Sequence, residues 1–130
     1  ISLRLVADQK PQQVFEQLKD AVEKAKPRGV TAEVKLIHSA PALLVNTENP
    51  FIQAAAAALS EAFGRETVYI RSGGSIPIAG AFDRNLGIPS VLMGFGLPDD
   101  NLHAPNEKFS LDSFYRGIAA VARYMERLGA

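Results

Sequence analysis

The order of helix-like and strand-like segments in the second half of the chain constrains its fold more than any other feature. Helical spacing predicts three helices there, at residues 51–63, 76–86 and 110–128. Two short apolar runs between them, at residues 68–70 and 91–95, predict strands. This alternation is typical of a parallel sheet covered by helices. We therefore expect an α/β fold with a short, mainly parallel sheet flanked by helices.

The first third of the chain predicts a separate, α+β arrangement. Residues 1–6 and 31–37 alternate between apolar and polar side chains, and residues 14–26 repeat apolar side chains at helical spacing. These segments predict a small sheet with one helix packed on it. A polar, turn-rich stretch lies between the two halves of the chain. We therefore expect one domain at residues 1–45 and a second at residues 46–130.

The last predicted helix carries the clearest local signals. Ser110 is a favourable N-cap, and Asp112 lies in the first turn, where a negative charge complements the helix dipole. An apolar stripe at helical spacing follows and is expected to be buried. It consists of Phe114, Ile118, Val121, Met125 and Leu128.

Composition disfavours several classes of partner and site. The formal net charge is zero, so bulk electrostatics favours neither a nucleic acid nor a membrane surface as a partner. The chain has no cysteine, which excludes disulfides, thiolate zinc ligands and a cysteine nucleophile. We find no apolar run long enough to span a bilayer, and we expect no signal peptide. Because Ile1 starts within a strand-like pattern, we expect a fragment of a longer protein. We expect that protein to be cytoplasmic.

A glycine-rich turn and a loop with a histidine are the two candidate sites. Gly73, Gly74 and Ser75 follow a predicted strand and precede a predicted helix, where backbone N–H groups suit a carboxylate or a phosphate. A tight turn with Ser75 as a structural cap is the alternative, and spacing alone favours it. His103 lies in a loop between a predicted strand and the last helix, a usual place for ligands in α/β folds. A solvated side chain is the alternative to metal ligation, because a zinc site needs three or four protein ligands.

Other polar residues have weaker claims to a site. Arg4 lies opposite the apolar face of the first predicted strand, where a guanidinium either binds a carboxylate or solvates the sheet. Asp99 and Asp100 are either a pair of acids or, more commonly for adjacent loop aspartates, caps of a turn. His38 lies in a polar stretch, and we expect it to have no role.

Several segments together resemble a known family of enzymes. The stretch ISLRLVADQKPQQVFEQL resembles the strand and helix of the lid, or dimerisation, domain of aminoacylase- and carnosinase-type dizinc peptidases, metallopeptidase family twenty. RSGGSIPI, FGLPDDNLHAPNE and the closing helix resemble the C-terminal part of that family's catalytic domain. The resemblance spans nearly the whole chain in family order. It implies hydrolysis of an amide bond in a dipeptide or an acyl-amino acid by a metal-activated water, and a homodimer formed through the lid domain.

The resemblance also implies roles for single residues. His103 corresponds to the last metal ligand of the family, which completes one of two zinc positions; manganese or cobalt is the alternative metal. Gly74 and Ser75 correspond to an element that contacts the substrate. Arg4 corresponds to the lid arginine that binds the substrate carboxylate in carnosinase-like members.

Other parts of the family's site do not occur in the sequence. The His-x-Asp motif and the Glu-Glu pair that carries the general base are both absent, and we expect them upstream. This implies that the chain alone is inactive and binds zinc weakly. Two alternatives remain open: a lid-like dimerisation module without catalysis, and a small anion-binding domain that uses Gly74 and Ser75.

Overall fold

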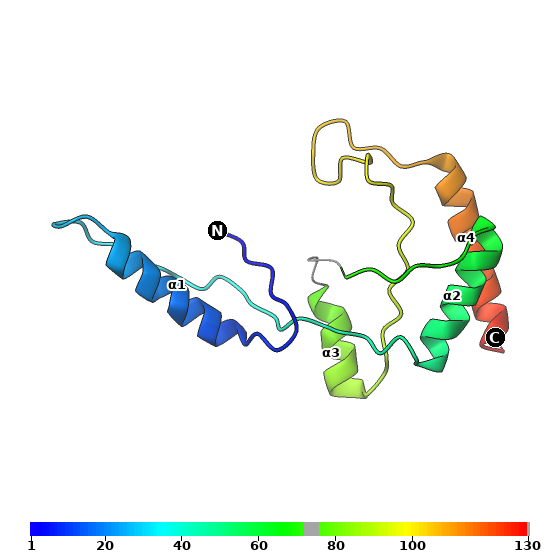
Figure 1. Ribbon diagram of the computed structural model, residues 1–130, viewed down its shortest axis with the longest axis horizontal. Coiled ribbons are helices and arrows are strands. Elements are labelled where there is room, and N and C mark those ends of the chain that lie inside the picture. Colours follow the sequence, from blue (N-terminus) through cyan, green and yellow to red (C-terminus); the bar gives the residue numbers. More distant parts are fainter. Residues whose placement is uncertain (72–75, 130) are drawn as a thin grey trace. The chain divides into compact units, whose positions relative to one another are not determined.

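The computed structural model describes residues 1–71 and 76–129. Its helices, in chain order, are α1 (Pro11–Ala25), α2 (Pro50–Phe63), α3 (Pro77–Leu86) and α4 (Leu111–Arg127) (Figure 1). Each corresponds to a helix predicted from the sequence. Contacts divide the chain into two compact units, one formed by residues 1–44 and 71–90, the other by residues 45–70 and 91–130.

The predicted α/β fold, with its small first sheet and mainly parallel second sheet, is wrong. The described residues form no strand, and their backbone hydrogen bonds outside the helices all belong to turns, loops and caps. A strand exists only when its N–H and C=O groups pair with those of a neighbour, and an alternating pattern does not supply that neighbour. The apolar side chains of the extended segments stay in solvent instead: Ile1, Ile37 and Ile70 are each at least 83% exposed.

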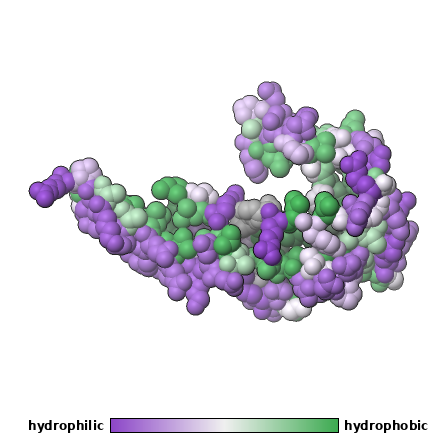
Figure 2. Space-filling view, in the orientation of Figure 1, coloured by the Kyte–Doolittle hydropathy of each residue, from purple (hydrophilic) through white to green (hydrophobic). Residues whose placement is uncertain are grey.

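Helix α1, in the first unit, is amphipathic but only half-buried. It begins at Pro11, whose fixed φ and missing N–H suit the first position of a helix. Val14, Leu18 and Val22 lie on its apolar face, and each is partly covered rather than buried. Figure 2 shows hydrophilic side chains gathered along one side of this helix. The stability of this helix therefore depends mainly on its own sequence, and tertiary packing adds little to it.

Helix α3, also in the first unit, is bounded by proline and glycine. It begins at Pro77 with Ile76 at the N-cap position and ends at Gly87, which takes a left-handed conformation with φ of 64°. A glycine adopts this conformation without a steric penalty, and so it ends the helix. The prediction that Ser75 caps this helix falls outside the described residues.

The second unit is built on the packing of α2 beside α4 (Figure 1). Asn49 caps α2, because its side-chain oxygen accepts a hydrogen bond from the Phe51 N–H at 3.0 Å. The predicted N-cap of α4 is confirmed: Ser110 Oγ accepts a hydrogen bond from the Ser113 N–H at 3.3 Å. Caps of this kind satisfy backbone donors that a helix leaves unpaired.

The residues that α2 and α4 bury are mostly small. The buried residues of α2 are Ile52, Ala55 and Ala58, and those of α4 are Ser113, Gly117 and Ala120. Small residues let two helix axes approach closely. The prediction that the large apolar stripe of α4 is buried is therefore wrong. Its residues, Phe114, Ile118, Val121, Met125 and Leu128, are 41–55% exposed.

Arginines of α4 add polar contacts to this helix pair. Arg116 Nη1 donates hydrogen bonds to the carbonyls of Ala62 and Phe63, each at 3.4 Å, at the end of α2. Arg123 and Arg127 form ion pairs with Glu61. Among the described residues, no helix has both the length and the apolar character required to cross a membrane.

Candidate functional site

A loop at residues 96–109 in the second unit carries His103 (Figure 1). Hydrogen bonds of Asp100 close this loop. Asp100 Oδ2 accepts a hydrogen bond from the Leu97 N–H at 2.6 Å, and the Asp100 N–H donates to the Leu97 carbonyl at 3.1 Å. The Asp100 carbonyl accepts a hydrogen bond from the Lys108 N–H at 3.0 Å. Asp100 thus contacts both ends of the loop that contains His103.

The side chain of Asp100 is buried, unlike the rest of this loop. Asp100 is 1% exposed, and its Oδ1 has no hydrogen-bond partner among the described residues. Burying a carboxylate oxygen without a donor is costly. The capping role predicted for the two adjacent aspartates is confirmed for Asp100. Its burial was missed, because no sequence signal distinguishes it from Asp99.

Asp99 lies on the surface and pairs with a residue at the far end of the loop. Its carboxylate accepts a hydrogen bond from the Lys108 ammonium. This hydrogen bond lowers the pKa of Asp99 and raises the pKa of Lys108 from their ordinary values. Because both groups are exposed to solvent, the pair contributes little to overall stability. The carboxylates of Asp99 and Asp100 therefore have separate partners.

The backbone at His103 is strained. His103 has φ of 60°, and Asn101 and Asn106 have φ of 53° and 62°. These values lie in the left-handed region, which residues other than glycine rarely adopt. The Ala104 N–H donates to the Asn101 carbonyl at 3.0 Å and closes a turn around the histidine. Strained backbone of this kind concentrates at functional sites.

His103 fits the role of a single metal ligand, because its side chain is exposed and a neutral imidazole nitrogen binds zinc readily. Across residues 1–71 and 76–129, however, no group of three or more His, Cys, Asp or Glu residues is placed to hold a metal ion. A zinc site takes three or four protein ligands. The described part of the chain therefore does not form a complete zinc site.

Arg4, the other predicted site residue that the structure describes, lies in the first unit. His38 also belongs to it, and both side chains are exposed. Gly74 and Ser75, predicted to contact the substrate, lie outside the described residues. The substrate-binding roles of Arg4, Gly74 and Ser75 stay predictions.

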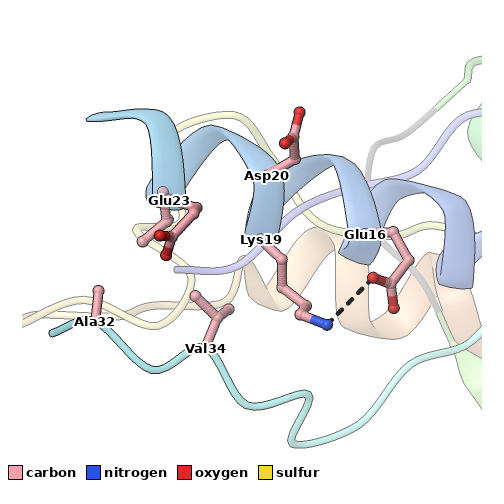
Figure 3. A pocket seen from close by; sticks show the side chains of 7 residues that line it. Glu16, Lys19, Asp20, Glu23, Ala32 and Val34 are labelled. Atoms are coloured by element: carbon pink, nitrogen blue, oxygen red, sulfur yellow. Dashed lines mark hydrogen bonds and ion pairs between the residues drawn. The ribbon is translucent and has the colours of Figure 1, made fainter. Parts of the chain in front are cut away.

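A pocket in the first unit lies between α1 and the extended segment that follows it (Figure 3). Its lining consists of Glu16, Lys19, Asp20, Val22, Glu23, Ala32 and Val34. Lys19 pairs with Glu16 at 3.2 Å, and Asp20 pairs with Lys24 at 2.5 Å (Figure 3 draws the first pair). Charged side chains that are exposed and already paired are typical of a solvated helix face. This pocket was not predicted from the sequence, and its chemistry indicates no ligand.

Comparison with known proteins places the chain among metallopeptidases. Residues 3–127 match the group described as Peptidase family M20/M25/M40. The Cys-Gly metallodipeptidase DUG1 of Candida albicans is 31% identical over 97 residues, which are 75% of this chain and 20% of that protein. DUG1 of Saccharomyces cerevisiae is 32% identical over 92 residues, which are 71% of this chain and 19% of that protein. The chain thus spans about a fifth of the length of these relatives.

Two solved structures share the backbone course of this chain. The dipeptidase Dug1p of Saccharomyces cerevisiae aligns with 93% of the chain at a TM-score of 0.83 and 27% identity, over 26% of its own length. The metallo-carboxypeptidase Sso-CP2 of Sulfolobus solfataricus aligns with 94% of the chain at a TM-score of 0.74 and 29% identity, over 28% of its own length. The segments of this chain therefore follow the course found within larger metallopeptidases.

Proposed function

Because this chain belongs to Peptidase family M20/M25/M40, we propose that it is part of a zinc-dependent dipeptidase. The family match over residues 3–127 is the observation that carries the proposal. Dipeptides are the favoured substrates because the similar proteins are named dipeptidases, and acyl-amino acids are the alternative. The reaction is hydrolysis of an amide bond.

In this proposal, the chain contributes metal and substrate contacts rather than the general base. His103 holds one metal ion through its imidazole. When bound, the metal pair supplies an activated water and polarises the scissile carbonyl. Arg4 binds the substrate carboxylate, since a guanidinium donates two parallel hydrogen bonds to such a group. Gly74 and Ser75 donate further hydrogen bonds to the substrate, and the general base comes from outside these 130 residues, because the sequence contains no Glu-Glu pair.

We extend the proposal to the organisation of the complete enzyme. Residues 1–45 belong to a lid domain through which two copies of the enzyme dimerise, and residues 46–130 belong to the catalytic domain. Zinc is the favoured metal, with manganese or cobalt as the alternative, and the cytoplasm is the favoured location. All of these assignments rest on the family resemblance of the sequence.

The two histidines of the chain provide a matched test of the proposed function. We expect His103→Ala, in the full-length product of the reading frame that carries this chain, to lose bound zinc and at least about 100-fold in kcat on Cys-Gly. A lost ligand leaves the metal site incomplete. His38→Ala replaces the other histidine, which is also exposed, and should retain both zinc and activity. Zinc content by elemental analysis and steady-state kinetics measure the two effects.

The outcomes separate the proposal from its main alternative. If His103→Ala keeps its zinc and its activity, the assignment of His103 is wrong. If the unchanged full-length protein neither binds zinc nor cleaves dipeptides, the chain belongs to a non-catalytic, lid-like module of the family.

A further inference from the structure

The loop at residues 96–109 contains most of the strained non-glycine residues of the described chain. Asn101, His103 and Asn106 are all left-handed, and Asp8 is the one other described residue of this kind. In this region the Cβ of an L-residue crowds the following carbonyl oxygen, which asparagine tolerates better than most residues do. Such conformations persist only where surrounding contacts hold them. The loop therefore needs a group that holds it.

Asp100 is the group in a position to hold this loop. Its hydrogen bonds to Leu97 and Lys108 join the two ends of the segment that contains His103. The bond from the Leu97 N–H to Oδ2 is 2.6 Å long, which is short for an N–H···O hydrogen bond. Asp100 is also the most deeply buried polar residue of the described chain. Its position is thus fixed by packing as well as by hydrogen bonds.

The contacts within the described chain do not explain why residue 100 is an aspartate rather than an asparagine. Only Oδ2 of Asp100 binds the loop, and the amide oxygen of an asparagine would accept the same hydrogen bond without burying a charge. Oδ1 is buried and has no partner among the described residues. Because an unpaired buried carboxylate oxygen is costly, a carboxylate at this position points to a hydrogen-bond donor that meets Oδ1 in the complete protein.

We infer that Asp100 is the positioning residue of His103. Its Oδ2 holds the loop in the strained form that presents the histidine, and its Oδ1 accepts a hydrogen bond from an N–H or O–H donor outside the described contacts. The inference rests on the proposed function, because it acts through the metal assigned to His103. Groups that orient a metal ligand change metal affinity by about 10- to 100-fold when they are removed.

The test compares Asp100→Asn and Asp100→Ala with Asp99→Asn in the full-length protein. Asp100→Asn keeps the shape and the acceptor for the Leu97 N–H but places an amide N–H₂ where Oδ1 meets its donor. We expect both Asp100 variants to bind zinc at least about 10-fold more weakly, measured by competition with a chelating dye. Their kcat on Cys-Gly should fall in parallel while KM changes by less than about twofold. Asp99→Asn replaces an exposed neighbour and should leave zinc affinity unchanged.

Deuterium exchange of the metal-free protein gives a second readout that does not depend on activity. Exchange of the amides at residues 97–108 should be faster in both Asp100 variants than in the unchanged protein. Asp100→Ala removes the acceptor of the Leu97 N–H, and Asp100→Asn loses the contact between Oδ1 and its donor. Exchange in α2 and α4, the packed helices of the same unit, should stay the same, which shows that the variants are folded. If Asp100 serves stability alone, both variants will lower the unfolding temperature while the folded protein keeps its zinc affinity, and the inference is overturned.

The outcomes also separate this inference from the proposed function. If Asp100→Asn matches the unchanged protein in zinc affinity and exchange, Oδ1 meets no donor and the inference fails. If His103→Ala removes zinc while both Asp100 variants keep it, the inference fails and the proposed function stands. If His103→Ala itself keeps zinc, the proposed role of His103 is wrong, and the inference about Asp100, which depends on it, is wrong as well.

Discussion

Adjacent residues with the same side chain have different roles in this chain, and their surroundings cause the difference. Asp99 is exposed and pairs with Lys108, whereas Asp100 is buried and holds the Leu97 N–H. From the sequence, a cap or a pair of acids was predicted for both. The capping role of Asp100 follows from the short reach of an aspartate to its own turn. Its burial could not be predicted, because it depends on how the rest of the unit covers the loop.

The ion pair of Asp99 predicts a pH dependence of the loop. The hydrogen bond from Lys108 lowers the pKa of Asp99, so the stabilisation from the pair is complete above the ordinary aspartate pKa of about 4. It is lost as the pH falls through the lowered pKa. We expect Lys108→Gln to return the pKa of Asp99 toward its ordinary value, measured by NMR titration of the carboxyl carbon. Lys10→Gln removes an exposed lysine of the other unit and should leave the Asp99 pKa unchanged. If Lys108→Gln also leaves the Asp99 pKa unchanged, the ion pair between Asp99 and Lys108 is contradicted.

At the scale of elements, the helices and the Ser110 cap of α4 could be predicted, because both depend on neighbours in sequence. Ser110 begins α4 as predicted, and Gly64 and Gly87 end α2 and α3 in left-handed conformations. The buried face of α4 could not be predicted. The hydrophobic effect favours burial of the apolar stripe, but the stripe stays about half exposed. The small residues next to it on the helix are buried instead. Only the partner helix determines which face is covered.

Gly117 is buried on α4 beside the ring of Phe95, and its replacement tests the packing of the second unit. A Cβ added at Gly117 would lie 3.3 Å from the ring of Phe95, whereas one added at Gly94 meets nothing within 4 Å. We expect Gly117→Val in the full-length protein to lower the free energy of unfolding by about 1–3 kcal/mol, because added methyl groups overpack a close contact. Chemical unfolding measures the change. Gly94→Ala is the control with open space at the new methyl, and equal losses in both variants would argue against close packing at Gly117.

At the scale of the molecule, the predicted site is only partly present in this chain. His103 is the one metal ligand that the family resemblance assigns here, and the described residues contain no cluster able to complete a site. The family could be predicted because its motifs are local and occur in order. The sheets were predicted wrongly, because strand pairing depends on residues distant in sequence or outside these 130.

Zinc binding by the polypeptide of 130 residues alone tests whether metal ligands are missing from it. We expect calorimetric titration with zinc to show weak binding alone, with no step tighter than about 10 μM, because a single imidazole cannot supply the three or four bonds of a zinc site. The same polypeptide with His103→Ala should give nearly the same isotherm. Two tight sites in the unchanged polypeptide would mean that its own residues complete a metal centre.

The sequence by itself determined the helices, the Ser110 cap of α4, the loop that carries His103 and the family to which the chain belongs. Each of these depends on residue types at short, ordered spacings, which act through local backbone geometry and short-range hydrogen bonds. Only the tertiary structure decided that the extended segments stay unpaired, that α4 buries its small residues, and that Asp100 is enclosed while Asp99 is exposed. Burial and strand pairing depend on contacts between residues far apart in sequence. A local pattern does not indicate which distant residue a given residue will contact.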